Sequence, residues 1–338
     1  MPIAVSKIEE IFKKISTLRI GVIGDFAVDF YYDINYHTQE KSVETGKEVF
    51  WGAKPHSSLG AAGNVVHNLS SLGARYIQLF GCIGDDVYGR EMTHLFQSLG
   101  VDTKDLKKPL SDWDTCTYTK PMSKNGEENR LDFGTHNTLS EELFGEILSS
   151  LDSALNELDV LVINQQFPNP LLNERRIEQL NLLINKFPGC LFVSDLRAYG
   201  KSIKNTILKV NTEEMARLLG IQEVNESDEN ACIEHGKTLQ LQIGDSLIVT
   251  RGEYGILYLD TEEIKNVRAI PIHSEIDTVG AGDTVVAAFS ASKGTGASIE
   301  HSLEIANLAA AVTVQKLRQT GTANQQEILH LYHKHFNL

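Results

Sequence analysis

The residues from 277 to 283, Asp-Thr-Val-Gly-Ala-Gly-Asp, combine a small, flexible backbone with a carboxylate at its end. They lie between a predicted strand, 264–272, and a predicted helix, 284–293, so backbone N–H groups stay uncovered where the helix begins. Such N–H groups and the helix dipole favour a bound anion. Asp283 would stand beside that anion, where a carboxylate can take the proton of a hydroxyl that attacks a phosphate. The segment therefore indicates phosphoryl transfer, and the simpler alternative is a glycine-rich turn in which Asp283 caps the helix.

Two acidic residues and one amide are candidates for binding a polyhydroxyl substrate. Asp25 and Asp29 follow the predicted strand 19–24, and ligands of open α/β sheets bind beyond the carboxyl ends of the strands. A carboxylate there can accept hydrogen bonds from two neighbouring hydroxyls, although a solvated turn acid explains Asp29 as well. Gly60 and Asn64 open a predicted helix, where small residues let a ligand approach the backbone and the amide can donate and accept. Close helix packing explains the small residues equally well.

Asn211 and Glu214 stand three residues apart at the start of the predicted helix 212–219, so they share a face of its first turn. Glu214 could hold a magnesium-bound water beside phosphates, because Mg²⁺ prefers oxygen ligands and keeps much of its hydration. The same pair also fits a plain capping box, with Asn at the N-cap and Glu at N3. The spacing alone favours the capping box.

Two more strand ends carry residues suited to phosphate. Thr250 and Gly252 follow a strongly β-forming run and fit a loop near a nucleotide phosphate, but they also fit any hairpin turn. Asp195 and Arg197 end another predicted strand, where they form either a surface pair or a part of the phosphate site.

Short β-forming runs alternate with helical periodicity, which predicts an α/β fold of parallel strands joined by crossover helices. Residues 1–18 form an amphipathic stretch with Val5, Ile8, Ile11, Phe12 and Ile15 on one face. The predicted core strands are 19–24, 76–81, 160–164, 190–194, 246–250 and 256–259. The predicted helices are 62–72, 89–99, 140–155, 170–186, 212–219, 229–241, 284–293, 298–317 and 325–335.

Two segments interrupt this alternation. Residues 30–58 are rich in β-forming and aromatic types without a helical period, and 115–133 predict two short strands, 116–120 and 129–133. A turn at 124–126 would join these strands. Long loops in compact domains are usually functional, so we expect a small β lid over one edge of the sheet, inserted into one domain that spans residues 1–338. The alternative is a pair of irregular surface loops.

The net charge of −14 argues against a nucleic acid or an anionic membrane as the main partner. Cys82, Cys116, Cys190 and Cys232 are far apart and form no C-x-x-C pair, which indicates reduced thiols in a cytoplasmic protein. The N-terminal stretch lacks the apolar core of a signal peptide, and no apolar run reaches the length of a membrane span. The sequence therefore predicts a cytoplasmic protein that acts on a small molecule.

In this order, the motifs resemble those of the ribokinase-like (pfkB) family of sugar kinases, over residues 19–322. Residues 277–283 match the D-T-x-G-A-G-D signature of that family at every fixed position. Residues 60–64 look like its N-terminal glycine signature, and 211–214 match its N-x-x-E motif. The resemblance implies a three-layer sandwich with a β lid, a homodimer formed through the lid, and transfer of the ATP γ-phosphoryl group to a sugar hydroxyl.

The resemblance also implies a role for each matching residue, with ATP and Mg²⁺ as cofactors and a monovalent cation left open. Asp283 would be the general base. An anion hole would be formed by the N–H groups of Gly280, Ala281 and Gly282, and magnesium and phosphates would be organised by Asn211 and Glu214. The residues along the nucleotide would be Asp195, Thr250, Gly252 and Asp277, with Asn307 near adenine. The sugar would be bound by Asp25, Asp29, Gly60, Asn64 and Arg130.

Within the family, the layout is most similar to the heptose 7-phosphate kinases that form one domain of bifunctional ADP-heptose synthesis enzymes. The matching pieces are 24–29, 64–74, 130–133 and 249–251. This chain departs from that branch at three places that bear on the substrate. Ala61 stands where the branch has a second glycine. The S-P-E-A-P lid segment of the branch is reduced here to Ser-Val-Glu-Thr at 42–45, and the D-P-K motif of the branch is replaced here by Asp-Leu-Arg at 195–197. No H-x-G-H motif of a nucleotidyl-transfer domain is present, so we expect a stand-alone kinase.

Two other functions remain compatible with the sequence. A kinase of the same fold could accept a nucleoside or another small alcohol, since the aromatic lid residues Tyr31, Tyr32 and Trp51 leave room for a base. A chain of kinase origin could also act as a sugar or nucleotide sensor without catalysis. The intact 280–283 segment favours an enzyme, because a chain freed from catalysis need not keep the base.

Overall fold

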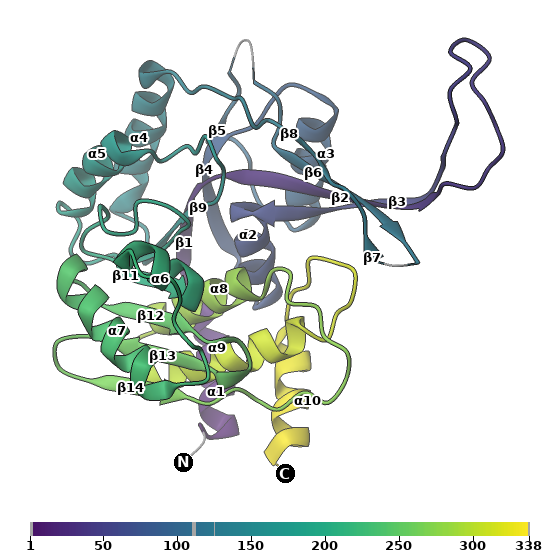
Figure 1. Cartoon of the computed structure of the whole chain (residues 1–338). Coiled ribbons are helices and arrows are strands. Elements are labelled where there is room, and N and C mark those ends of the chain that lie inside the picture. The colour runs from purple at the N-terminus through teal and green to yellow at the C-terminus, as the bar shows by residue number, and fades with distance from the viewer. Residues whose placement is uncertain (1–2, 110–112, 125, 337–338) are drawn as a thin grey trace.

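The structure is a computed structural model that describes residues 3–109, 113–124 and 126–336. Its centre is a nine-stranded sheet in the order β14-β13-β12-β11-β10-β9-β1-β4-β5 (Figure 1). Seven strands run parallel, and β13 and β14 are antiparallel at one edge. The strands are β1 Arg19–Gly24, β4 Tyr76–Cys82, β5 Leu106–Lys107, β9 Val160–Gln165, β10 Leu191–Leu196, β11 Ile207–Asn211, β12 Leu247–Thr250, β13 Ile256–Leu259 and β14 Ile264–Val267.

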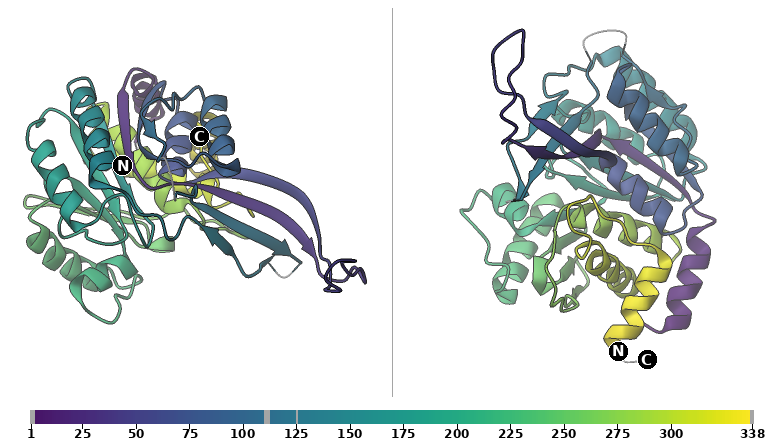
Figure 2. Two further views of the ribbon diagram at one scale, coloured as in Figure 1. Left: turned by 90° about the horizontal axis from the view of Figure 1, so that it is seen from above. Right: turned by 90° about the vertical axis from the view of Figure 1, so that its right-hand side faces the viewer.

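Helices cover both faces of this sheet, which confirms the predicted α/β sandwich (Figure 2). One face packs against α1 Val5–Ile15, α2 Ala62–Ser71, α3 Val87–Ser98, α8 Ala281–Gly294, α9 Ile299–Thr313 and α10 Gln325–Phe336. The other face packs against α4 Glu141–Leu155, α5 Glu174–Ile184, α6 Thr212–Leu219 and α7 Glu229–Ile243.

The central strands alternate their side chains between these two layers. Val160 and Val162 of β9 belong to the core under α8, whereas Leu161 and Ile163 belong to the core under α4 and α5. Both sets are fully buried, because the crossover helices of a parallel sheet cover both of its faces. This alternation decides which polar residues at the strand ends can face α8.

A second, five-stranded sheet forms from the two segments that interrupt the alternation. Its strands are β2 Phe26–Asn35, β3 Trp51–Ala61, β6 Thr117–Ser123, β7 Gly126–Glu127 and β8 Leu131–Phe133, in the order β3-β2-β6-β7 with β8 paired to β6. We call it the lid sheet. Its strands β2 and β3 continue beyond the body of the molecule, and residues 36–50 join them in an arm that projects away (Figures 1 and 2).

Several predicted element bounds were wrong. Strand β11 was not predicted, although it supplies the centre of the sheet beside β12. Helix α5 begins at Glu174 and not at residue 170, because Asn173 caps it by accepting from the Arg176 N–H. Helix α9 ends at Thr313, and the next carbonyl, Val314 O, accepts from Asp277 N.

Three further bounds also differ from the prediction. The strand expected at 264–272 ends at Val267, and the one expected at 129–133 is Leu131–Phe133. Helix α8 begins at Ala281, three residues earlier than predicted, so residues 281–283 lie within its first turn. Asn125, in the predicted turn 124–126, lies outside the described residues.

The two ends of the described chain lie together, where Tyr332 Oη donates to Ile3 O at 2.6 Å (Figure 1). Among the helices that the structure describes, none combines the length and the apolar character needed to cross a membrane.

Candidate active site

The start of helix α8 is a cradle of exposed backbone donors. Gly280, the N-cap, has a φ of +78°, and a Cβ there would come within 2.7 Å of Asn64 Nδ2. A side chain at this position would therefore be strained and would collide with the amide. Within the described residues, the N–H groups of Gly282 and Asp283 have no backbone acceptor, as expected in the first turn of a helix. This turn can therefore receive an anion.

Asp283 points from this turn into a buried polar contact. Asn64 Nδ2 donates to its Oδ2 at 2.8 Å, and Gln166 Nε2 donates to its Oδ1 at 3.3 Å. Burial raises the pKa of Asp283 to about 7, and the neighbouring Asp195 carboxylate adds to the rise. A carboxylate with that pKa can both take and hold a proton near neutral pH.

A row of polar side chains lies on the sheet beneath this turn. Asn164, Asp195 and Lys209 are register neighbours on β9, β10 and β11, on the face that packs against α8. Lys209 Nζ pairs with Asp195 Oδ1 at 3.2 Å, and both side chains are almost fully buried. A Cβ added to Gly282 would lie 3.0 Å from Lys209 Nζ. The absence of a side chain at Gly282 thus leaves the ammonium group directly against the anion cradle.

The charges in this row are tightly coupled. Burial lowers the pKa of Lys209, but the carboxylates around it, Asp195 first, raise it above its ordinary value. Burial raises the pKa of Asp195, and the Lys209 charge opposes that rise. The Asn164 amide is buried, and neither of its polar atoms has a partner in the described part of the chain. The row therefore presents one buried positive charge and an unsatisfied amide to the start of α8.

Asn211 and Glu214 form the capping box that their spacing indicates. Glu214 N donates to Asn211 Oδ1 at 2.7 Å, and Asn211 N donates to Glu214 Oε2 at 2.8 Å. The box holds one carboxylate oxygen of Glu214, near Lys209 and Asp195, and the described residues make no hydrogen bond to the other oxygen. Among the described residues, no group of three or more His, Cys, Asp or Glu side chains is placed to hold a metal ion.

The residues expected along the nucleotide lie at the same edge of the sheet. Thr250 ends β12, and Gly252 follows it with a φ of +51° in a 3-10 turn. Asp277 shapes the loop before α8, because its two oxygens accept from Val279 N and Arg318 N.

Asn307 lies on α9, and its amide donates to Arg268 O at 2.9 Å. None of the four nucleotide candidates at 250, 252, 277 and 307 contacts Asp283 directly in the described structure.

On the opposite side of Asp283, the lid sheet supplies Asp29. Its Oδ1 pairs with Lys120 Nζ at 3.0 Å, and its Oδ2 accepts from Thr320 Oγ1 at 2.5 Å. A Cβ at Gly60 would come within 3.1 Å of the same carboxylate, so the backbone there packs closely on Asp29. Tyr31 Oη contacts both Lys120 and Thr320. Asp29 is therefore almost fully buried, and its charge is balanced by a buried lysine.

Asp25 and Arg130 do not join this cluster. The Asp25 carboxylate accepts from the N–H groups of Gln166, Phe167 and Leu171, so it anchors the loop after β9. The Arg130 side chain is half exposed and makes two hydrogen bonds to Asp132. Its guanidinium lies 4.5 Å above the ring of Tyr118, on the lid sheet.

Sequence reasoning missed four residues of the site: Lys120, Gln166, Lys209 and Thr320. A signal existed for Lys209, because it is a single charge within the apolar run of a buried strand, Ile-Leu-Lys-Val. Thr320 carried none, since it follows the last turn of α9 in an ordinary polar loop.

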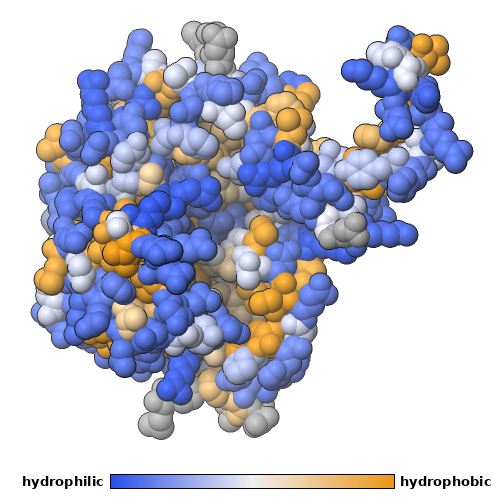
Figure 3. All heavy atoms as spheres, viewed as in Figure 1, coloured by the Kyte–Doolittle hydropathy of each residue, from blue (hydrophilic) through white to orange (hydrophobic). Residues whose placement is uncertain are grey.

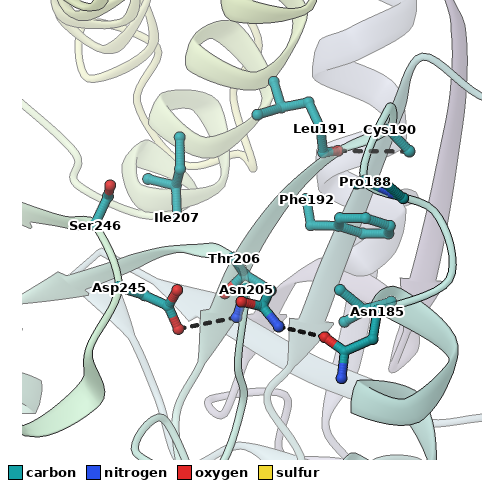
Figure 4. Close-up of a pocket in the computed structure, with 11 residues that line it drawn as sticks. Asn185, Pro188, Cys190, Leu191, Phe192, Asn205, Thr206, Ile207, Asp245 and Ser246 are labelled. Carbon is teal, nitrogen blue, oxygen red and sulfur yellow. Dashed lines mark hydrogen bonds between the residues drawn. The ribbon is translucent and has the colours of Figure 1, made fainter.

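The face seen in Figure 3 is largely hydrophilic and is hollowed near the start of α8. A different pocket, of about 470 Å³, lies at the amino ends of β10, β11 and β12 (Figure 4). It is lined by Cys190, Phe192, Asn205 and Asp245 among others, and Asn205 N donates to Asp245 Oδ2. None of the candidate residues lines it, because they gather at the carboxyl ends of the strands.

A family model described as pfkB family carbohydrate kinase matches residues 53–326. Curated relatives include the bifunctional protein HldE of Helicobacter hepaticus, 30% identical over 326 residues, and that of Hydrogenovibrio crunogenus, 27% identical over 320 residues. Both matches cover 93% of this chain, but only 64% and 62% of the relatives. The chain thus spans less than two thirds of the length of these relatives.

Solved structures share the fold. Ribokinase from Thermotoga maritima has a TM-score of 0.69 and 20% identity, with 93% of this chain and 99% of that chain covered. Phosphofructokinase-2 from Escherichia coli has a TM-score of 0.73 and 18% identity, with 94% and 99% covered. The fold is therefore ribokinase-like, as the sequence motifs indicated.

Proposed function

Since the chain belongs to the pfkB family of carbohydrate kinases, we propose that it transfers the γ-phosphoryl group of ATP to a hydroxyl of a sugar or sugar phosphate. The observation that carries this proposal is the arrangement at the start of α8. Asp283, with a pKa near 7, stands in the same helical turn as backbone N–H groups that have no backbone acceptor within the described residues. The Asp283 carboxylate would remove the proton of the attacking hydroxyl, and the N–H groups would stabilise the transferred phosphoryl group.

Each step uses a residue of this chain. Asp283 would accept the hydroxyl proton, and the N–H groups of Gly280 and Gly282 would bind the phosphoryl oxygens. The N–H of Ala281 donates to Thr278 O at 3.1 Å, so it would join them only by giving up that bond. Lys209 lies against Gly282 and neutralises charge on the same oxygens. Asn64 orients the base through its hydrogen bond to Oδ2.

The donor set fits Mg²⁺ held mainly by water and phosphate. Glu214 offers one carboxylate oxygen that its capping box does not use, and Asn211 fixes its position. Magnesium keeps several waters and is bound by few protein carboxylates, so a single acid near the phosphates suffices. When bound near Glu214, the ion would supply positive charge that offsets the charge of the leaving group.

The nucleotide would extend from this point over the carboxyl ends of β10 to β12. Asp195 would act there through Lys209, Thr250 and Gly252 would lie beside the phosphates, and Asn307 near adenine. Asp277 would lie beside the nucleotide and would also shape the loop before α8, since its oxygens accept from Val279 N and Arg318 N. A monovalent-cation requirement is left to experiment.

The favoured acceptor is D-glycero-D-manno-heptose 7-phosphate, phosphorylated at the 1-hydroxyl. Two observations support a phosphorylated sugar. Tyr118 and Lys120 share with Asp29 the inner face of the lid sheet, as their register pairs show. Arg130 lies over Tyr118 and pairs with Asp132, so this face carries two cations and two carboxylates. The half-exposed Arg130 guanidinium is the group that would reach a phosphate. Asp25 would position the loop that closes the sugar site.

ATP turnover across a panel of acceptors tests the proposal. The panel includes heptose 7-phosphate, ribose, fructose phosphates, ketodeoxy sugar acids and nucleosides, with ADP release as the signal. We expect release with a sugar or sugar phosphate. Turnover only with nucleosides would assign the alternative acceptor class, and no turnover with any acceptor, together with ligand binding, would assign a sensor.

We also propose a homodimer formed through the lid sheet and a cytoplasmic location. Three large apolar side chains are exposed on the arm and at the adjoining start of β3, namely Tyr36, Phe50 and Trp51. A second copy of the chain would bury them. The four cysteines are free and buried, which suits a reducing compartment. Sedimentation that shows only monomers would reject the dimer.

A further inference from the structure

At the amino end of the large sheet, strand β10 begins before its neighbour β11. Leu191 and Phe192 of β10 pair with β9, but the pairing of β10 with β11 starts only at Val193 and Ile207. Leu191 and Phe192 therefore have no strand beside them on the β11 side, which leaves a notch in the sheet. Both residues and Ile207 line the pocket of about 470 Å³ in Figure 4. A pocket of this volume suits a small molecule.

The pocket has an apolar side and a polar side (Figure 4). Its apolar lining includes Pro188 and Phe192, and its polar side is a row formed by Asn185, Asn205 and Asp245. Asn205 N donates to Asp245 Oδ2 at 2.9 Å, and Asn205 Nδ2 donates to Asn185 Oδ1. These hydrogen bonds join three separate connecting loops, so they hold the polar row in place. An apolar wall with a few fixed polar groups is the usual composition of a small-molecule site.

Among the described residues that line the pocket, Asp245 is the only charged one. Its carboxylate is half-buried, and no ion pair to it is present in the described part of the chain. The neighbouring Lys204 ammonium donates instead to Ile243 O at 2.8 Å. Burial raises the pKa of Asp245, and the Asn205 N–H and the Lys204 charge oppose that rise. A bound cation would compensate the hydration that this carboxylate has lost.

We propose that this pocket is a second ligand site, which binds a small primary amine with an aromatic body. The ammonium group would donate to Asp245, and the aromatic body would pack against Phe192 and Pro188. A neutral ligand would leave the carboxylate without a cation, and an anionic ligand would be repelled by it. The candidate active site lies at the carboxyl ends of the same strands, so this inference goes beyond the proposed function and does not depend on it.

The test measures the binding of three ligands of similar size and different charge to the full chain by calorimetry. The probe is phenethylamine, and its neutral and anionic counterparts are phenethyl alcohol and phenylpropionate. At about pH 8 an alkyl amine is protonated and a carboxyl group is ionised. We expect a dissociation constant of about 1 mM for the amine. The alcohol should bind about tenfold more weakly, because it lacks the hydrogen bond between two charged groups, and phenylpropionate should bind more weakly still.

Asp245→Asn locates the binding. The variant keeps an oxygen that can accept from Asn205 N, but it removes the charge. It should bind the amine about tenfold more weakly than the parent chain and the alcohol equally well. The matched control is Asp228→Asn, because Asp228 is an exposed acid that also accepts from a backbone N–H but lies outside the pocket. The control should bind the amine as the parent chain does.

Several results would overturn the inference. Two of them concern the parent chain alone: no binding of the amine at millimolar concentrations, or equal affinities for the amine and the alcohol. These results hold even if Asp245→Asn does not fold. Amine binding that is unchanged in Asp245→Asn, or equally weakened in Asp228→Asn, would place the amine elsewhere or assign the effect to net charge. None of these results bears on phosphoryl transfer, which the acceptor panel tests separately.

Discussion

The phosphoryl side and the sugar side of the candidate active site are assembled differently. On the phosphoryl side, residues 280–283 are consecutive, and Asp195 and Lys209 beneath them stand on adjacent strands. On the sugar side, Asp29 is bound by Thr320, which lies 291 residues away in the chain, and by Lys120 from another strand of the lid sheet. The proposed reaction chemistry thus lies in one local segment, whereas the proposed acceptor recognition would depend on contacts between distant segments.

The helices that open toward the two sides show the same contrast in their backbones. Helix α8 begins after Gly280 and helix α2 after Ala61, both at positive φ and both without a side-chain cap. Glycine at position 280 keeps the anion cradle free of strain and of side-chain atoms. Alanine at position 61 holds its backbone at the cost of about 1–3 kcal/mol typical of such conformations, and its side chain is buried with Ala27 and Cys116.

The largest expected effect lies on the phosphoryl side. Asp283→Asn should lower turnover about 10³-fold, because general-base catalysis contributes that order, while ATP still raises the unfolding temperature. ADP release with the best acceptor measures it. The control is Asp152→Asn, an exposed acid on α4, which should behave like the parent. Turnover near the parent level in Asp283→Asn would show that Asp283 is not the general base.

Removing the buried cation should affect both rate and stability. Lys209→Met leaves the Asp195 charge unpaired, and losing one partner of a buried ion pair typically costs about 3–5 kcal/mol. We also expect kcat to fall about 10²-fold, with a smaller change in the KM of the sugar. Denaturant unfolding and steady-state kinetics measure the two effects. Lys209→Arg is the matched variant, because it keeps the positive charge. If its kcat were as low as that of Lys209→Met, the exact position of the charged group would matter more than the charge itself.

The titration of Asp283 should link activity and stability to pH in opposite directions. Its pKa is about 7 in the folded chain and near 3.8 when unperturbed, so folding takes up a proton between about pH 4 and 7. The free energy of unfolding should therefore fall as pH rises through this window. The kcat/KM should instead rise with pH and level off above about 7, because the base must be ionised.

Unfolding and kinetics at a series of pH values measure both trends. Asp283→Asn supplies the reference, since it lacks this titration and should show a flatter dependence of stability on pH. If the stability of Asp283→Asn depended on pH as strongly as that of the parent chain, the titration would belong to other buried acids, such as Asp25 or Asp195.

The smallest expected effect lies on the sugar side. Thr320→Val removes a hydroxyl that contacts both Asp29 and Tyr31, and a hydrogen bond to a charged group contributes about 1.5–3 kcal/mol. We expect a KM for the sugar several-fold higher and an unchanged KM for ATP. Thr322→Val, two residues later, is the control. Its backbone carbonyl accepts from Lys316 Nζ, and within the described residues its side chain makes no hydrogen bond to this cluster. Equal rises in both KM values would show that the two sides are not separable.

Much of the fold and of the phosphoryl side could be predicted from the sequence. The 277–283 segment, the capping box of Asn211 and Glu214, and the amphipathic helix α1 are local patterns, in which neighbours in the chain are also neighbours in space. Two helix ends were predicted wrongly. The start of α5 is set by a capping side chain, and the end of α9 is followed by a tertiary hydrogen bond.

The sequence by itself indicated the reaction class, because the residues proposed as anion cradle and base are consecutive and fall within one helical turn. Only the tertiary structure decided that Lys209 lies under Gly282, that Lys120 and Thr320 hold Asp29, and that Asp25 serves the loop after β9. These contacts depend on strand register and on which face each side chain takes, and a shift of one residue would reverse that face. The substrate-binding side therefore became visible only when the strands were paired.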